Sequence, residues 1–286
     1  MIRIIVCHQI GQLGNCLYRM AHLIAFARDH EATVYDLSFS RKGYAKHFAF
    51  SRNQLVVRYP DFLRVPFNAV PIQNGIWKLF RTLQRRKLVT NPRLLGGSFD
   101  QHILQELKSP QIEFEGVDFV YKNGVKHHAN FIREYMRFND SIQDKTSRFI
   151  NRLRDSCEVV VGVHVRRRDF KHFDSGKHYY SWASYANYAK RISKLLPNKK
   201  VTFAICTDSP GEYSSVYFGK LKTALSGFSA AEDMSVLSKC DLIIAPGRST
   251  FSGWASFVGQ VPRLCMSKSA NECCLEDFST VRSLIN

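Results

Sequence analysis

The second half of the chain alternates between segments with helical periodicity and short apolar runs. In order these are WASYANYAKRISKLL, VTFAIC, AAEDMSVLSKC, LIIA, STFSGWASFVG and PRLCMS. The helical segment SIQDKTSRFINRLRDS and the apolar run EVVVGVHV come before them. Helices and strands that alternate in this way are typical of a parallel sheet covered by helices, so we predict an α/β fold.

The first half of the chain begins in a similar way. MIRIIV has the pattern of a short buried strand, and NCLYRMAHLIAFARDH has helical spacing before a second strand, TVYDL. This order is the start of a βαβ unit. The pattern from residue 38 to 138 is weaker, and its elements cannot be ordered. We therefore predict two α/β domains, covering residues 1–155 and 156–286, as suits a chain of this length.

The composition is that of a folded globular protein, with 45% hydrophobic and 23% charged residues. No apolar run approaches the roughly 18 residues of a membrane-spanning helix. The first residues also lack the basic and long apolar regions of a secretory signal, so we expect a cytoplasmic protein. The eight cysteines have no metal-ligand spacing, and several lie in apolar runs. Buried, reduced thiols are the expected state.

The net charge of +17 favours anionic partners without naming them. Nucleic acid, anionic lipid and nucleotide diphosphates are all compatible with it. Much of the charge lies between Arg41 and Arg93, where Asp61 is the single acid. Within this region residues 75–88, GIWKLFRTLQRRKL, have the pattern of a basic amphipathic helix. Such a helix could contact anionic lipid headgroups, or it could simply pack on its own domain.

Loops with unusual residues follow the predicted strands. In an open parallel sheet, ligands bind outside the carboxyl ends of the strands. The loops in question are GQLGN (11–15), HVRRRDF (164–170) and the run from Asp233 to Trp254. We therefore expect them to contribute to a ligand site.

The loop HVRRRDF concentrates positive charge after a buried strand. His164, Arg166 and Arg168 would share one face of a continuing strand and Arg167 the other, so we expect the strand to end here. Arginine suits a diphosphate because its planar fork donates paired hydrogen bonds and its charge does not titrate. Asp169 could orient an arginine or accept a proton from a substrate hydroxyl. A surface charge cluster is the alternative interpretation.

The other two loops have features of anion sites. GQLGN places Gly14 and Asn15 at the expected start of a helix, where backbone N–H groups and the helix dipole favour an anion. A tight turn that requires glycine is the alternative. Ser249 and Thr250 lie at another expected helix start, and N-capping alone explains only part of this hydroxyl cluster. Asp233 near a helix start could simply compensate a helix dipole.

No metal site is predicted. The ten histidines include the adjacent pair His127 and His128, whose rings cannot easily share one ion. No Cys and His spacing indicates a nucleophilic pair.

Several segments together resemble the α1,2-fucosyltransferase family. GQLGNCLYRMA resembles its GxLGNQ motif, GVHVRRRDF its HxRRxD motif, and EDMSVLSKCDLIIAPGRSTFSGWASFV its C-terminal block. FAICTDSPGEY is similar to its FxxxSDD stretch. The HxRRxD motif also occurs in α1,6- and protein O-fucosyltransferases, whereas the other blocks favour the α1,2 group.

The resemblance implies a GT-B-like fold in which two Rossmann-type domains face a cleft. It also implies metal-independent transfer of fucose from GDP-fucose to a glycan hydroxyl, with inversion at the fucose carbon. The C-terminal domain would bind the nucleotide sugar, and the N-terminal domain would face the acceptor. No other cofactor and no nucleic acid are expected.

The motifs also imply roles for individual residues. Arg166 would contact the donor diphosphate, while His164 and Asp233 would hold the guanosine. Ser249 and Thr250 would meet the phosphates. The N-terminal motif, with Gly14 and Asn15, would reach toward the donor or acceptor, and Arg167 and Asp169 would support the geometry of Arg166. Asp169 is the first candidate for the general base, and Asp174 is the second.

The chain departs from the family pattern at several positions. Cys16 stands in place of Gln, Arg168 in place of Gly, and Gly253 in place of Trp, and APGR adds residues before STFS. Another nucleotide sugar therefore stays open as the donor. The leading hypothesis is a fucosyltransferase acting at the cytoplasmic face of a membrane. A basic nucleic-acid-binding protein and an inactive glycan-binding relative are the alternatives.

Overall fold

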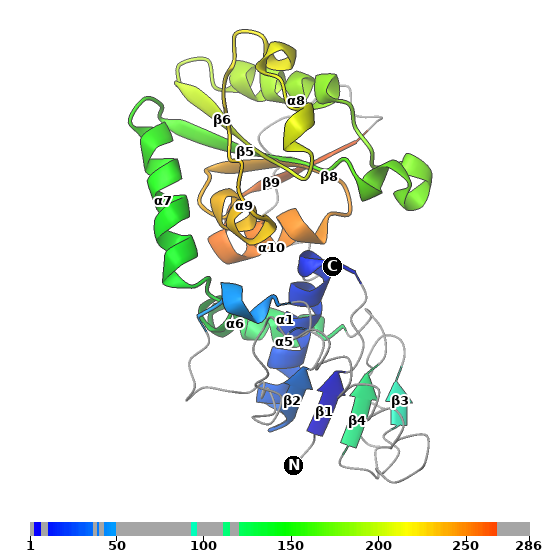
Figure 1. Ribbon diagram of the computed structural model, residues 1–286. Helices are drawn as coiled ribbons and strands as arrows, with labels where there is room; N and C mark the ends of the chain where they lie inside the picture. The colour runs from blue at the N-terminus through cyan, green and yellow to red at the C-terminus, as the bar shows by residue number, and fades with distance from the viewer. Residues whose placement is uncertain are drawn as a thin grey trace. The chain divides into compact units, whose positions relative to one another are not determined.

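The computed structural model describes residues 3–6, 11–36, 39, 43–49, 93–95, 111–114 and 120–267. The chain divides into two compact units, Met1–Arg137 and Phe138–Asn286. In both units, the described strands form a parallel sheet (Figure 1). The predicted α/β fold is therefore confirmed. The basic segment 75–88 lies outside the described residues.

The division between the units falls after Arg137, whereas the sequence pattern predicts a boundary near residue 156. The difference concerns helix α7 (Asp140–Arg154), which packs on helix α9 (Ala230–Leu237) of the second unit. Their contact includes Thr146 Oγ1 and Ser235 Oγ, which lie 2.9 Å apart and are buried. The apolar face of α7 therefore belongs to the core of the second unit.

The sheet of the second unit has the strand order β7-β6-β5-β8-β9, with every neighbouring pair parallel. Its strands are β5 (Val159–Val165), β6 (Val201–Thr207), β7 (Lys222–Leu225), β8 (Leu242–Pro246) and β9 (Arg263–Met266). Strands β5, β6, β8 and β9 were all predicted from their apolar runs. The edge strand β7 was not, because its sequence, KTAL, is short and only partly buried.

Helices cover both faces of this sheet. Helix α8 (Trp182–Leu195) lies on one face, and α7, α9 and α10 (Thr250–Gly259) lie on the other (Figure 1). Short 3-10 turns connect the elements at Asp169–Lys171, Phe173–Gly176, Pro210–Glu212 and Ser215–Phe218.

Strand β5 lies in the middle of the sheet, and its two faces meet different helices. Val161 and Val163 are fully buried in the core that includes Tyr185 of α8. Gly162 and His164 belong to the opposite face. A Cβ atom on Gly162 would lie 2.7 Å from Cδ2 of Leu237, so this glycine allows α9 to approach the strand closely.

The sheet of the first unit has the strand order β2-β1-β4-β3. Its strands are β1 (Arg3–Val6), β2 (Thr33–Asp36), β3 (Arg93–Leu95) and β4 (Gln111–Phe114). Helix α1 (Leu13–Asp29) connects β1 to β2, which confirms the predicted βαβ start. The described part of this unit also contains the 3-10 turn Ala45–His47, α5 (Lys122–His127) and α6 (Ala129–Tyr135).

Helix α1 is buried along most of its length, including Leu17, Ala21 and Ile24. Polar groups are buried with them. The Nδ1 atom of His22 accepts a hydrogen bond of 2.9 Å from the backbone N–H of Tyr121, just before α5. Burial lowers the pKa of His22 to about 4, so the ring is neutral at pH 7. Within the described ranges, no helix combines the length and apolar character needed to cross a membrane.

Candidate functional site

Most of the predicted donor-site residues of the second unit lie at or next to the ends of the central strands β5 and β8, whereas Asp233 lies in helix α9. Strand β5 ends at Val165, so Arg166 and Arg167 leave the sheet and their side chains diverge. Strand β8 ends at Pro246, three residues before Ser249. Because β5 and β8 are parallel neighbours, their carboxyl ends share one edge of the sheet.

Arg166 is held by acids on two loops. Its Nε and Nη2 atoms each donate a 2.8 Å hydrogen bond to an oxygen of Asp169, and its Nε atom lies 3.4 Å from Oδ2 of Asp208. Its backbone N–H donates to the hydroxyl of Tyr185, 3.3 Å away. Burial alone would raise the pKa of Asp169, but the hydrogen bonds and charge of Arg166 hold that pKa below its usual value.

Arg167 points toward a different set of partners. Its Nε atom donates to Glu212 at 2.8 Å, and its Nη1 atom donates to the carbonyl of Tyr180 at 3.1 Å. Its guanidinium lies 4.6 Å from the ring centre of Tyr179. Arg168 is exposed. The three arginines therefore do not form one shared anion site. Of the two neighbours expected to support Arg166, Asp169 pairs with it, whereas Arg167 pairs with Glu212.

His164 is buried beneath this edge. Its Nδ1 atom lies 3.4 Å from Oγ of Ser249, and its ring stacks on Phe251 with the centres 4.7 Å apart. Burial, together with the charges of Arg166 and Arg263, lowers the pKa of His164 to about 3. The imidazole is therefore neutral at pH 7 and can donate or accept one hydrogen bond at each nitrogen, according to its tautomer.

Ser249 is the N-cap of α10, and Thr250 is the first residue of that helix. The Oγ of Ser249 accepts from the backbone N–H of Ser252 at 3.5 Å. Arg263 on β9 lies behind this turn: its Nη1 atom donates to the carbonyl of Ser249 at 3.0 Å and to Oγ of Ser252 at 3.2 Å. The start of α10 therefore combines hydroxyls, a helix N-terminus and a buried guanidinium.

Asp233 is buried in α9. Its carboxylate accepts a hydrogen bond of 2.5 Å from Ser226, and the Cys206 thiol donates to its backbone carbonyl at 3.7 Å. Burial raises the pKa of Asp233 to about 7, although the hydrogen bonds from Ser226 and Cys206 oppose this shift. Cys206 pairs with His164 in the β5–β6 register, which links Asp233 to the same edge of the sheet.

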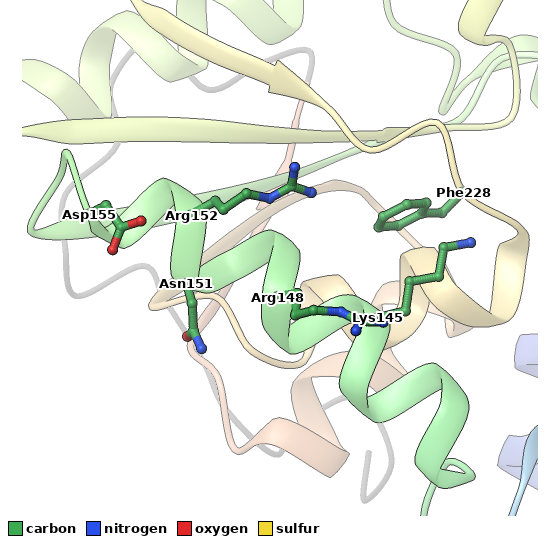
Figure 2. Close-up of a pocket in the computed structure, with 6 residues that line it drawn as sticks. All are labelled: Lys145, Arg148, Asn151, Arg152, Asp155 and Phe228. Carbon is green, nitrogen blue, oxygen red and sulfur yellow. The ribbon is translucent and has the colours of Figure 1, made fainter.

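Two pockets lie along α7. One, of about 580 Å³, is lined by Lys145, Arg148, Asn151, Arg152, Asp155 and Phe228 (Figure 2). The other, of about 380 Å³, shares Arg152 and Phe228 and reaches Ser226. Since Ser226 donates to Asp233, the second pocket approaches the buried carboxyl.

The loop after β5 bends sharply beside this edge. Asp174 and Ser175 in this loop have φ values of 47° and 53°, which are uncommon for residues other than glycine. Arg248, in the loop after β8, has a similar φ of 57°. Oδ2 of Asp174 lies 3.6 Å from Nε2 of His178 and 4.0 Å from Nη1 of Arg248. Phe173, next to Asp174, stacks on Phe170.

The first unit contains the remaining candidates, Gly14 and Asn15. The N-cap of α1 is Gln12, so Asn15 is the third residue of the helix and not its cap. The Asn15 side chain crosses Gly11, where a Cβ atom would lie 2.0 Å from Nδ2. Gly11 has a φ of 81°, as the tight-turn interpretation of this loop requires. The expected contact of Asn15 and Gly14 with donor or acceptor stays a prediction.

Sequence reasoning overlooked three partners at this edge, namely Asp208, Glu212 and Arg263. Asp208 and Glu212 lie in FAICTDSPGEY, so a carboxylate directly after a buried strand was an available signal. Arg263 had no comparable signal, because a single arginine in an apolar strand does not indicate its neighbours. Among the described residues, no group of His, Cys, Asp and Glu side chains is arranged to hold a metal ion.

Comparisons with known proteins identify related folds. No protein-family profile and no curated protein matches the sequence. An Arabidopsis thaliana FUT1 variant in complex with GDP is 12% identical with a TM-score of 0.61, covering 98% of this chain and 74% of that one. NodZ, an alpha-1,6-fucosyltransferase co-crystallised with GDP, is 17% identical with a TM-score of 0.56, covering 93% and 96%; NodZ comes from Bradyrhizobium.

POFUT1 in complex with GDP is 14% identical with a TM-score of 0.56, covering 94% of this chain and 98% of that one. At such identities the similarity establishes the fold. The chain therefore has the GT-B-type α/β fold of these fucosyltransferases.

Proposed function

We propose that the chain is a metal-independent, inverting fucosyltransferase that transfers fucose from GDP-fucose to a hydroxyl of a glycan. This proposal rests on one observation: His164, Arg166 and Ser249 lie close together at the carboxyl ends of β5 and β8. His164 and Arg166 belong to one motif and Ser249 to another, and both motifs resemble those of fucosyltransferases. The fold shared with three fucosyltransferase structures, each in complex with GDP, supports the same conclusion.

The donor would lie along this edge, with its guanosine toward Asp233. A carboxylate there can accept hydrogen bonds from the N–H groups of a purine, and the pocket that reaches Ser226 leaves space beside it. His164 would hold the guanosine from the end of β5. Ser249 and Thr250 at the start of α10, together with Arg166, would meet the diphosphate.

In the transfer step, the acceptor hydroxyl oxygen forms a bond to the fucose anomeric carbon on the face opposite the diphosphate. The bond from that carbon to the diphosphate oxygen breaks, and GDP leaves with the electron pair. The hydroxyl proton passes to a carboxylate base. Hydrogen bonds and positive charge at the diphosphate stabilise the leaving group as its charge develops.

Asp169 and Asp174 are the two candidates for the general base. Both oxygens of Asp169 already accept hydrogen bonds from Arg166, which makes Asp169 a poor proton acceptor. Asp174 contacts His178 and Arg248 only at 3.6 and 4.0 Å, and both contacts use Oδ2. These contacts favour Asp174, the second candidate, as the base, with Asp169 fixing the orientation of Arg166.

The first unit, with Gly14 and Asn15, would face the acceptor and reach toward the donor. The α1,2 linkage is proposed from the sequence motifs alone; the structural relatives include an alpha-1,6 enzyme. A cytoplasmic location, with residues 75–88 in contact with an anionic membrane, is proposed on the same basis.

Calorimetric titration against a panel of nucleotide sugars, with and without EDTA, tests the proposal. We expect GDP-fucose to bind and to be hydrolysed equally well in EDTA. The variant Arg166→Ala should lose most of its GDP affinity, whereas Lys190→Ala, which removes an exposed cation on α8, should keep it. Binding of a different nucleotide sugar in place of GDP-fucose would overturn the donor assignment. Unchanged affinity in Arg166→Ala would remove the proposed role of that residue.

A further inference from the structure

The arginines after β5 do not supply net positive charge. Arg166 is paired with Asp169 and lies near Asp208. Arg167 is paired with Glu212, and its backbone N–H donates to Asp208. Three acids face Arg166 and Arg167, and Arg168 is exposed. The acids therefore already neutralise the charge of these arginines. A diphosphate bound here would need positive charge from other residues.

Arg263 is such a source. This residue is 7% exposed, and within the described part of the chain no acid forms an ion pair with it. Its Nη1 atom donates to Ser249 and Ser252, and its Nε atom is buried with no hydrogen-bond partner among the residues that the structure describes. A buried charge without a counter-ion is costly in free energy. An anion at the start of α10 would offset that cost.

Arg248 is the second source. It directly precedes Ser249, its side chain is 73% exposed, and its only ion pair among the described residues is the 4.0 Å contact with Asp174. An ion pair this long and exposed contributes little stability. Arg248 also adopts a left-handed backbone conformation, which is unfavourable for a residue with a Cβ atom. Such conformations persist where the surrounding structure requires them, and they are frequent at functional sites.

We propose that Arg248 and Arg263 supply the net positive charge that holds a diphosphate at the N-terminus of α10. Arg248 contacts the diphosphate directly and leaves Asp174 as it does so. Arg263 acts as a positioning residue, because it holds the Ser249 carbonyl and places a fixed charge behind the turn. Arg166 contributes hydrogen bonds without net charge. This inference rests on the proposed donor site, and it also frees Asp174 to accept a proton once the donor has bound.

Titration calorimetry with GDP and with inorganic pyrophosphate, at low and at moderate salt, tests this proposal. We expect Arg248→Ala to weaken the binding of both ligands by about tenfold. The salt dependence of its affinity should also be smaller than in the wild type, because one screened charge is gone. Arg263→Met should weaken binding by at least as much, and Arg263→Lys, which keeps the charge, by no more than about threefold.

Two control variants separate charge from other effects. Lys190→Ala removes an exposed cation on α8 and should leave the affinity unchanged. Gln260→Gly relieves another left-handed residue, with a φ of 55°, and should not alter binding. Thermal unfolding of every variant shows whether it is folded. If Arg263→Met does not fold, Arg248→Ala and Arg263→Lys decide.

Pyrophosphate distinguishes this inference from the proposed function. If the wild type binds pyrophosphate but no guanosine nucleotide, and the arginine variants lose pyrophosphate, the charge assignment stands and the fucosyltransferase proposal fails. The assignment is wrong if Arg248→Ala binds pyrophosphate within about twofold of the wild type. It is also wrong if Arg263→Lys loses as much affinity as Arg263→Met, or if the wild type binds neither ligand.

Discussion

Asp169 accepts two hydrogen bonds from Arg166, with each carboxylate oxygen 2.8 Å from a guanidinium nitrogen. This pair turns the flat guanidinium in one direction at the end of β5. Because the Asp169 side chain is 47% exposed, the pair adds little to stability. Its effect on ligand binding depends instead on the orientation that it gives to Arg166.

The first prediction therefore concerns Asp169→Asn. An amide can accept at one oxygen only, so Arg166 loses its fixed orientation and GDP affinity should fall by about tenfold. The free energy of unfolding should change by no more than about 1 kcal/mol. Calorimetry and urea unfolding measure the two effects. Asp144→Asn, which changes an exposed acid on α7, is the matched control. Equal GDP affinity in both variants would show that Asp169 does not position Arg166.

The second prediction concerns the pH dependence of stability. Burial raises the pKa of Asp233 from 3.8 to about 7, so the folded protein holds this proton more tightly than the unfolded chain. The resulting stabilisation is complete below pH 4 and is lost as the pH rises to about 7. His164 acts in the opposite direction at acidic pH, since its pKa is lowered to about 3.

Asp233→Asn removes the first of these titrations and leaves the second. Urea unfolding at several pH values should show the variant gaining stability relative to the wild type as the pH rises from 4 to about 7, with no further change above that. A constant difference between the two proteins across this range would mean that Asp233 does not titrate there.

The third prediction concerns the close approach of α9 to β5. In Gly162→Ala the new methyl group would lie 2.7 Å from Cδ2 of Leu237 and 3.0 Å from Cys240 Sγ, so the Leu237 side chain or the helix must shift. We expect a loss of about 1–3 kcal/mol in the free energy of unfolding. The double variant with Leu237→Ala should show less than the sum of the two single losses, because the methyl group then occupies vacated space.

Gly211→Ala is the control for this test, because a Cβ atom there has no neighbour within 4 Å. If Gly162→Ala is as stable as this control, the packing of α9 on β5 is looser than the contacts indicate.

The sequence predicted the architecture of the second unit well, because apolar runs such as VTFAIC and LIIA form strands buried on both faces. It did not predict which unit α7 joins. The apolar stripe of a helix shows that the helix packs on something, and not which sheet that is. The short edge strand β7 was not predicted either, because its residues are partly exposed and do not form an apolar run.

The candidate site was predicted only in part. The rule that ligands bind at the carboxyl ends of parallel strands predicted that His164, Arg166 and Ser249 would lie at one edge of the sheet. It could not show that Asp208 and Glu212 compensate the arginines, because these acids come from another loop and meet them only in the folded chain. The partners of Arg263 depend equally on how β9 pairs with β8.

The last prediction separates the two carboxylates near the transfer step. If Asp174 accepts the hydroxyl proton, Asp174→Asn should lower kcat by about 10²-fold, the lower end of general-base effects, while GDP affinity stays within about twofold. Asp169→Asn should show the reverse pattern, because Asp169 acts on donor binding through Arg166. The kcat is measured with the best acceptor from a glycan screen, and GDP affinity by calorimetry.

Asp174→Glu keeps the carboxylate and should retain part of the kcat that Asp174→Asn loses. If Asp174→Asn keeps the full kcat, or loses GDP affinity as strongly as Asp169→Asn, the proton goes elsewhere and Asp174 serves only to restrain Arg248.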